Sequence, residues 1–284
     1  IEISQRCINE TCPEADAAII TIGRQAGEGM DRDVKTEFNL TDIERDMIFR
    51  VSDAFRLAGK PVIVILNSGS VVETRSWRDR VDAILMAWQP GEEGGNTVAD
   101  ILTGKVCPSG KLTMTWPVTA SDHPSTANFP QDDMSLYSYK EMKGWGVPMK
   151  GYDFTNHEED IYVGYRYFDT FGKPVAYPFG YGLSYTSFAY GKPAVKVNGA
   201  NVEVTVNVKN TGDVEGKEAV QVYVSAPKSS IEVPAKELKS FAKTRSLKPG
   251  ESQTLKMTIP VRDLASYDEH NSQWLAPAGT YTFH

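Results

Sequence analysis

The hydrophobic pattern of this chain changes its period once, and that change restricts the fold more than any other feature. In the first half, continuous apolar runs such as residues 62–66 (VIVIL) alternate with stretches whose apolar residues recur at helical spacing. Continuous apolar strands are typical of parallel sheets, because helices cover both faces of such a sheet. From about Phe188 onward, short runs of alternating apolar and polar residues are separated by turn residues. The sequence therefore predicts an α/β sandwich, with a mostly parallel sheet and helices on both faces, followed by an all-β sandwich.

The ends of several elements can be assigned from local signals. Thr41 and Glu44 form a capping-box pattern that opens a helix, and Gly59 and Pro61 end it. In the first half, we expect strands at residues 17–23, 62–66, 83–88 and 111–116, and further helical stretches at 71–77 and 92–103. In the second half, we expect strands at residues 201–209, 218–225, 237–242, 252–259 and 280–283.

A carboxylate stands between two glycines directly after the first expected strand. Residues 21–33 read TIGRQAGEGMDRD, with Glu28 between Gly27 and Gly29. The next two strands are also followed by glycine-rich loops, NSGS (67–70) and QPGEEGG (89–95). The carboxyl ends of parallel strands meet at one edge of a sheet, where ligands bind in folds of this class. We therefore expect the three loops to lie together at that edge.

Composition excludes several classes of partner. The net charge of −7 argues against a nucleic-acid partner, and no apolar run approaches the roughly 20 residues of a membrane span. The three cysteines, Cys7, Cys12 and Cys107, form no disulfide framework, although a Cys7–Cys12 bridge is conceivable. Two cysteines and His123 match no zinc spacing, so neither a metal nor a cofactor is expected.

Several motifs resemble glycoside hydrolase family 3, in its β-glucosidase branch. They are WQPGEEGGNTVADILTGKVCPSGKLTMTWP (88–117), EEDIYVGYRYFDT (158–170), PFGYGLSYTSF (178–188), NTGDVEGKEAVQVYV (210–224) and ELKSFAKTRSLKPGES (237–252). The family combines a (β/α)₈ barrel, an α/β sandwich and a fibronectin type III-like domain, and this chain resembles the last two. The resemblance implies an α/β sandwich over residues 1–170, a junction over 171–187 and a fibronectin type III-like domain over 188–284.

The resemblance also implies a retaining mechanism, with the general acid/base on a GEGYDR-like segment. The matching residues 27–32 read GEGMDR, so this role falls on Glu28, with Met30 in place of the tyrosine. A retaining glycosidase needs a second carboxylate about 5–5.5 Å away. In the family that nucleophilic aspartate lies in the barrel, and its motif is not found in these residues. Burial by the barrel would raise the pKa of Glu28, as an acid working near neutrality requires.

We therefore expect a hydrolase, the C-terminal part of an exo-β-glycosidase, with a β-glucosidase acting on terminal β-D-glucosyl residues as the leading case. Its partners would be a β-linked gluco-oligosaccharide or glucoside and the missing N-terminal barrel, with a homodimer left open and no nucleic acid or membrane. The alternatives are a β-xylosidase or other exo-β-glycosidase, and a non-catalytic carbohydrate-binding fragment. Both ends are expected to be cuts within a longer protein, periplasmic or secreted by resemblance. The fragment alone is expected to be inactive.

For the other candidate side chains, a structural role competes with a functional one. Asp31 and Arg32 could line a sugar subsite, although local pairing or capping is favoured. Residues 121–160 form a polar, aromatic loop in which Trp145 and Tyr152 are candidates to stack on sugar rings. The strand-like tyrosines Tyr162, Tyr165 and Tyr167 are weaker candidates, some of which pack the junction. Glu92 and Glu93 are expected in the first turn of a helix, and the acidic cluster of Glu158, Glu159 and Asp160 at a solvated loop edge.

Overall fold

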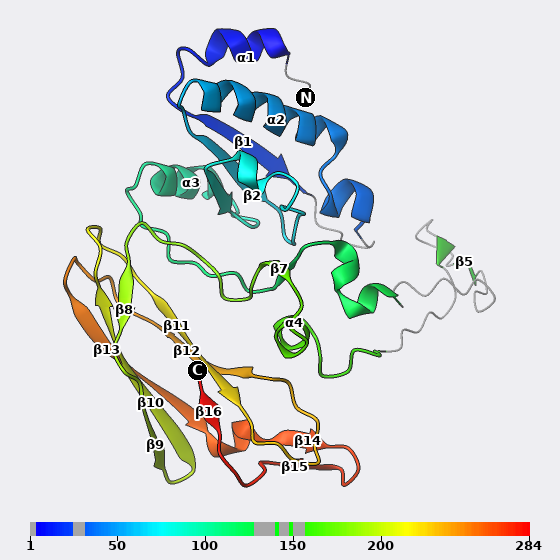
Figure 1. Cartoon of the computed structure of the whole chain (residues 1–284), viewed down its shortest axis with the longest axis vertical. Helices are drawn as coiled ribbons and strands as arrows, with labels where there is room; N and C mark the ends of the chain where they lie inside the picture. The colour runs from blue at the N-terminus through cyan, green and yellow to red at the C-terminus, as the bar shows by residue number, and fades with distance from the viewer. Residues whose placement is uncertain (1–3, 25–31, 128–139, 142–147, 150–156) are drawn as a thin grey trace.

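The fold was obtained as a computed structural model that describes residues 4–24, 32–127, 140–141, 148–149 and 157–284 (Figure 1). The first part of the chain contains α1 (Gln5–Thr11), β1 (Ala18–Gly23), α2 (Asp42–Leu57), β2 (Val62–Asn67), β3 (Ala83–Met86), α3 (Gly94–Leu102), β4 (Trp116–Pro117), α4 (Tyr165–Thr170) and β7 (Val175–Tyr177). Shorter elements are η1 (Val34–Phe38), η2 (Arg78–Arg80), η3 (Ala120–Asp122), η4 (Pro124–Ala127), β5 (Lys140–Glu141) and β6 (Pro148–Met149). Among the described helices, none has the length and apolar composition needed to cross a membrane.

The parallel sheet predicted for the first part is confirmed. Strands β1, β2 and β3 pair in that order, both times in parallel, with Ile20 beside Val64 and Val64 beside Ile84. Helix α2 packs on β1 and β2, and α1 packs on α2. Figure 1 shows α1 and α2 on one side of the sheet and α3 on the other. The sheet is therefore the middle layer of an α/β sandwich, as the pattern of continuous apolar strands predicts.

Helix α2 begins at the expected capping box. The backbone N–H of Glu44 donates to Thr41 Oγ1 at 3.3 Å, and the N–H of Thr41 donates to the Glu44 carboxylate at 2.9 Å. Ile48, Val51 and Phe55 recur at helical spacing and are buried against the sheet core. Gly59 follows the helix with a φ of +68°, which a side chain would strain. Local chemistry alone therefore accounts for both ends of this helix.

Two expected elements of the first part are wrong. Residues 71–77 form no α-helix: the backbone N–H of Glu73 donates to the carbonyl of Phe38 at 2.7 Å, and Trp77 is fully buried with its indole donating to the carbonyl of Glu73. Residues 111–116 form no continuous strand, because only Trp116 and Pro117 pair, antiparallel, with β7. The backbone of Leu112 instead exchanges hydrogen bonds with the junction, at Gly180 and Tyr181. In both stretches one residue makes backbone hydrogen bonds to a distant segment, Glu73 to Phe38 and Leu112 to Gly180 and Tyr181.

Tyr165 and Tyr167 correct a further expectation, because they lie in helix α4 rather than in a strand. Tyr165 packs against Phe179 in a tilted arrangement and against Tyr223 edge-to-face, with ring centroids 4.9 and 5.7 Å away. The Tyr165 hydroxyl accepts a hydrogen bond from the backbone N–H of Leu238 at 2.8 Å. Tyr165 therefore packs the contact between the two parts of the chain.

The second part is a two-sheet β-sandwich. One sheet contains β8 (Phe188–Tyr190), β9 (Ala194–Asn198), β10 (Asn201–Asn210) and β13 (Ser252–Pro260), and the other β11 (Ala219–Ser225), β12 (Glu237–Lys243) and β16 (Thr282–Phe283). The alternation of β10 and β11 is confirmed, because alternate residues such as Val204, Val206 and Val222 are buried in one core. Two elements without a predicted counterpart follow β13: η6 (Val261–Leu264) and a hairpin of β14 (Ser266–Asp268) and β15 (Gln273–Leu275).

Lys111 and Gly182 join the first part of the chain to the β-sandwich. The Lys111 ammonium lies 3.2 Å from the Glu218 carboxylate and also donates to the carbonyl of Gly182 at 2.8 Å. Both charged side chains of this pair are largely buried. A Cβ on Gly182 would lie only 2.4 Å from the carbonyl oxygen of Gly110. The junction backbone therefore approaches the PSGKL turn too closely for any side chain at position 182.

Gly182→Ala is therefore expected to lower the free energy of unfolding by about 1–3 kcal/mol, because the backbone must shift to admit the methyl group. Gly95→Ala is the matched control, because Gly95 lies in α3 and a Cβ there meets no atom within 4 Å. The control should be neutral or stabilising by up to about 1 kcal/mol. Denaturant unfolding of both variants measures the difference. Equal stability of the two variants would contradict the close approach.

Candidate functional site

Three glycine-rich loops leave the carboxyl edge of the parallel sheet, as predicted. β1, β2 and β3 end at Gly23, Asn67 and Met86. The backbone N–H of Arg24 donates to the carbonyl of Asn67 at 2.9 Å, so the first loop starts beside the second. A Cβ on Gly69 would lie 3.2 Å from the Gln89 side chain, so the second loop touches the third. The described parts of these loops therefore form one continuous edge.

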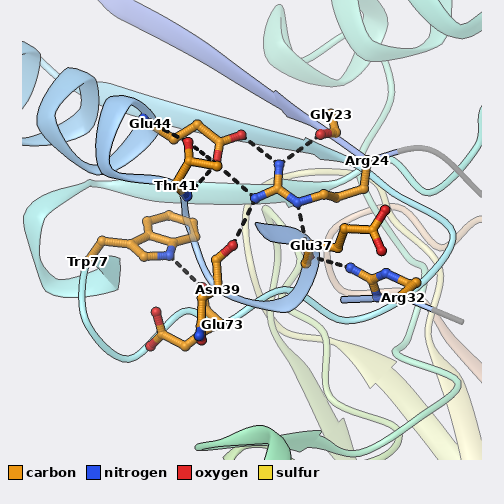
Figure 2. A network of polar contacts seen from close by, with 9 residues as sticks. All are labelled: Gly23, Arg24, Arg32, Glu37, Asn39, Thr41, Glu44, Glu73 and Trp77. Atoms are coloured by element: carbon orange, nitrogen blue, oxygen red, sulfur yellow. Dashed lines mark hydrogen bonds and ion pairs between the residues drawn. The ribbon is translucent and has the colours of Figure 1, made fainter. Parts of the chain in front are cut away.

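Four of the five predicted site residues lie outside the described residues: Glu28, Asp31, Trp145 and Tyr152. For the segment 25–31, the structure describes the two residues that flank it, Arg24 and Arg32. Both side chains are anchored at the same place, because each donates a hydrogen bond to the carbonyl oxygen of Glu37 (Figure 2). The two ends of the segment that carries Glu28 therefore meet at one backbone carbonyl beside the sheet.

Arg24 is an anchor that the sequence analysis missed. Its guanidinium forms two hydrogen bonds with the Glu44 carboxylate, at 2.6 and 2.9 Å, and only 5% of its side chain is exposed. It also donates to the backbone carbonyls of Glu37, Gly23 and Asn39, at 2.9, 2.8 and 3.1 Å (Figure 2). An arginine directly after a buried strand was the available signal, but apart from Gly23 its acceptors lie 13–20 residues away. Arg24 thereby ties the end of β1 to the start of α2.

The Glu44 carboxylate takes part both in the N-terminal cap of α2 and in the ion pair with Arg24. Burial alone would raise the pKa of its carboxyl group, but hydrogen bonds from Arg24 and Thr41 together hold that pKa below its usual value. Glu44 is therefore ionised at neutral pH and keeps its charge for Arg24. This one carboxylate couples the start of α2 to the first residue of the loop.

The other end of the segment is held by Arg32. Its guanidinium donates to the carbonyl of Val71 at 3.0 Å and to that of Glu37. Burial lowers the pKa of Arg32, while the nearby Glu37 carboxylate opposes this change. Its Nε is buried and has no hydrogen-bond partner among the described residues. Two backbone carbonyls thus fix the direction of the Arg32 side chain. The role of Arg32 in a sugar subsite stays a prediction.

The carboxylates of Asp33 and Glu37 accept hydrogen bonds from groups within residues 33–37. The Asp33 carboxylate accepts hydrogen bonds from the backbone N–H groups of Lys35 and Thr36, which caps η1. The hydroxyl of Thr36 also donates to it, and these bonds lower the pKa of Asp33. The Glu37 carboxylate accepts from the backbone N–H of Asp33 at 2.8 Å. Neither carboxylate is therefore poised for acid/base chemistry.

A cavity of about 290 Å³ lies beside this edge of the sheet. Ser70 and Val71, just beyond β2, line one side, and Thr115, His123 and Tyr165 line others. The Val71 carbonyl accepts from Arg32, so the cavity adjoins the anchored end of the loop. Burial lowers the pKa of His123, with a smaller opposing effect of Asp122, so this imidazole is neutral at pH 7. The cavity thus offers polar, uncharged groups such as Ser70, Thr115 and His123 beside Val71, which accepts from Arg32.

The remaining acidic candidates make no contact with the Arg24 and Arg32 anchors among the described residues. Glu92 and Glu93 are exposed and lie just before α3 rather than in its first turn. The Glu159 carboxylate lies 3.8 Å from a ring nitrogen of His157. Cys7 and Cys12 are free thiols, so the conceivable bridge between them is not formed. Across the ranges that the structure describes, no group of three or more His, Cys, Asp or Glu side chains is placed to hold a metal ion.

Comparisons with known proteins agree with this architecture. A model described as the glycosyl hydrolase family 3 C-terminal domain matches residues 4–185, and one described as a fibronectin type III-like domain matches residues 218–284. "Beta-glucosidase A" of Butyrivibrio fibrisolvens is 38% identical, over 95% of this chain and 35% of the relative. "Exo-alpha-(1->6)-L-arabinopyranosidase" of Bifidobacterium longum is 36% identical, over 96% of this chain and 33% of the relative.

A solved structure extends the similarity to the fold. Beta-glucosidase 3B from Thermotoga neapolitana, in complex with alpha-D-glucose, has a TM-score of 0.89 and 47% identity, over 99% of this chain and 37% of that chain. The chain thus spans about a third of the length of these three proteins. The chain belongs to glycosyl hydrolase family 3 and consists of the family's C-terminal α/β domain followed by a fibronectin type III-like domain.

Proposed function

We propose that the chain is the C-terminal part of a retaining β-glucosidase and that Glu28 is its general acid/base. The observation that carries the proposal is the anchoring of Arg24 and Arg32, which hold both ends of the GEGMDR loop at the carboxyl edge of the sheet. A strand-end loop can present a carboxyl group to a neighbouring domain while its ends stay fixed. Several similar proteins are named beta-glucosidases. Their names support the substrate class.

The proposed reaction divides two carboxylates between two domains. An aspartate of the barrel, N-terminal to this chain in the full-length enzyme, attacks the anomeric carbon and forms a covalent glycosyl-enzyme. Glu28 gives its proton to the leaving oxygen in this step. In the second step its carboxylate takes a proton from the attacking water, and the sugar leaves with its configuration retained. The mechanism needs Glu28 and the aspartate to lie about 5–5.5 Å apart.

A second substrate class is favoured by the names of two relatives. Two bifidobacterial proteins, 36% and 35% identical to this chain, are named exo-alpha-(1->6)-L-arabinopyranosidases. A pentopyranoside lacks the hydroxymethyl group at C5 that glucose carries, so a glucose site that contacts this group loses that binding energy with a pentoside. Xylose is also a pentopyranose without this hydroxymethyl group, so a β-xylosidase belongs to the same group of alternatives.

A substrate panel tests the proposal. We expect the full-length enzyme to cleave p-nitrophenyl β-D-glucoside with a kcat/KM at least about 10-fold above those of the β-D-xyloside and the α-L-arabinopyranoside, because contacts to one extra group are worth about 1–3 kcal/mol. The product is expected to be the β-anomer at first, by NMR. The isolated 284-residue chain is the control and should show no turnover, because it lacks the proposed nucleophile. Turnover by the purified chain, or initial release of the α-anomer, would contradict the two-domain retaining mechanism.

A further inference from the structure

The β14–β15 hairpin presents two aromatic side chains that the proposed reaction does not use. Tyr267 and Trp274 are directly opposite each other in the antiparallel pair. Their ring centroids are 5.4 Å apart, with 61° between the ring planes. The hairpin belongs to neither main sheet of the sandwich, and Figure 1 shows it at the end farthest from β1 and β2. The two rings therefore form a separate surface feature of the fibronectin type III-like domain.

Both rings face solvent. Trp274 is 71% exposed and Tyr267 is 46% exposed, and Leu275 beside them is also exposed. Among the described residues, neither the Trp274 indole N–H nor the Tyr267 hydroxyl has a hydrogen-bond partner. Buried or structural tyrosines and tryptophans usually satisfy these polar groups. The rings meet edge-to-face, so part of one ring face is covered, while the outer ring surface and the polar edges stay open.

The hairpin does not depend on these two rings for its shape. Leu264, just before β14, is buried in the sandwich core and anchors the start of the hairpin. The turn is closed by Asp268, whose carboxylate accepts from the side chain of Asn271 at 2.8 Å and from its backbone N–H at 3.2 Å. Removing an exposed ring should therefore leave the hairpin intact, which allows its role to be tested by substitution.

The size of the surface limits what it can bind. Three exposed apolar side chains, Tyr267, Trp274 and Leu275, offer at most a few hundred Å², because an aromatic residue buries about 150–250 Å² at most. A stable protein partner needs about 800 Å² per side. The turn that borders the rings (residues 268–273) is polar throughout. A small ligand with one apolar face and many hydroxyl groups fits such a surface better than a protein does.

We propose that Tyr267 and Trp274 form a binding surface for the pyranose rings of a β-linked glucan chain. In β-D-glucopyranose every hydroxyl group is equatorial, so the axial C–H bonds form apolar faces that can pack on an aromatic ring, whose face is electron-rich. The indole N–H and the phenol hydroxyl can bond the hydroxyl groups at the sugar edge. The glucan as ligand rests on the proposed β-glucosidase function. The surface would hold a polymeric substrate while its free end is hydrolysed elsewhere.

Affinity electrophoresis of the 284-residue chain tests this inference. We expect a soluble mixed-linkage β-glucan in the gel to retard the chain, and dextran, an α-glucan, to leave its mobility unchanged. Trp274→Ala should weaken retardation by the β-glucan at least about 10-fold, and Tyr267→Ala by a smaller factor. Phe241→Ala is the matched control, because Phe241 is an exposed aromatic residue on β12 of the same domain. It should migrate as the unsubstituted chain does. Thermal unfolding should be the same for all variants.

The outcomes separate this inference from the proposed function. If the unsubstituted chain is not retarded, or if Trp274→Ala and the parent chain are retarded equally, the glucan surface is refuted even where the full-length enzyme cleaves β-glucosides. If Phe241→Ala loses as much retardation as Trp274→Ala, binding is nonspecific and the surface is also refuted. If retardation depends on Trp274 while the full-length enzyme cleaves no β-glucoside, the surface stands and the proposed reaction fails. Loss of a dimer in Trp274→Ala, seen by light scattering with retardation unchanged, would assign the rings to self-association instead.

Discussion

Glu28→Ala in the full-length enzyme is expected to slow hydrolysis of cellobiose by about 10²–10⁴-fold, the usual contribution of general acid/base catalysis. Aryl glucosides with good leaving groups should lose far less in the first step, because their departure needs little protonation. Breakdown of the covalent intermediate should slow for every substrate, because no base then activates the attacking water. Steady-state kinetics with cellobiose and a series of aryl glucosides measure both effects.

Azide distinguishes the loss of a base from a general loss of structure. It attacks the glycosyl-enzyme without needing deprotonation, so it should restore turnover of aryl glucosides by Glu28→Ala and yield a β-glucosyl azide. Glu92→Ala is the matched control, because Glu92 is an exposed glutamate on another loop at the same edge of the sheet. It should keep the parent activity. Unchanged cellobiose hydrolysis by Glu28→Ala, or the absence of an azide adduct, would remove Glu28 from this role and turn attention to Glu92 or Glu159.

Arg24→Met is expected to lower the free energy of unfolding by about 3–5 kcal/mol, because it leaves the Glu44 charge without its partner in a largely buried site. The substitution also leaves the carbonyls of Gly23 and Asn39 without the donors that Arg24 supplies. Denaturant unfolding of the chain, followed by tryptophan fluorescence, measures the loss. Arg45→Met is the control, because Arg45 pairs with Asp42 on the exposed face of α2, and such pairs contribute about 0–1 kcal/mol.

The pH dependence gives a second readout of the same pair. The pKa of Glu44 in the folded chain is lower than its usual value of 4.5, so its contribution to stability is present above pH 4.5. That contribution declines as the pH falls through the folded-state pKa, where Glu44 becomes protonated. In Arg24→Met the acid loss of stability should therefore be smaller than in the parent chain. A parallel decline in both proteins, or equal stability of Arg24→Met and Arg45→Met, would show that the pair is not an important anchor.

The sequence by itself determined the elements whose signals are local. The capping box of Thr41 and Glu44, the glycine after α2 and the apolar run of β2 each depend on neighbours within a few residues, and all three appear where they were predicted. The alternation of β10 and β11 is local in the same sense, because side chains on a strand point to opposite faces in turn. The meeting of three loops at one edge followed from the parallel order of the strands.

Only the tertiary structure decided the features that depend on distant partners. Residues 111–116 have a strand-like composition, yet they hydrogen-bond to the junction near residues 177–181, more than 60 positions away. Arg24 and Arg32 both donate to the carbonyl of Glu37, and Arg32 also donates to that of Val71, 39 positions away, which no periodicity encodes. Likewise, the exposure of Trp274 depends on which surfaces the sandwich buries. Local propensities and capping interactions act between near neighbours, whereas burial and long-range hydrogen bonds are fixed only when the whole chain packs.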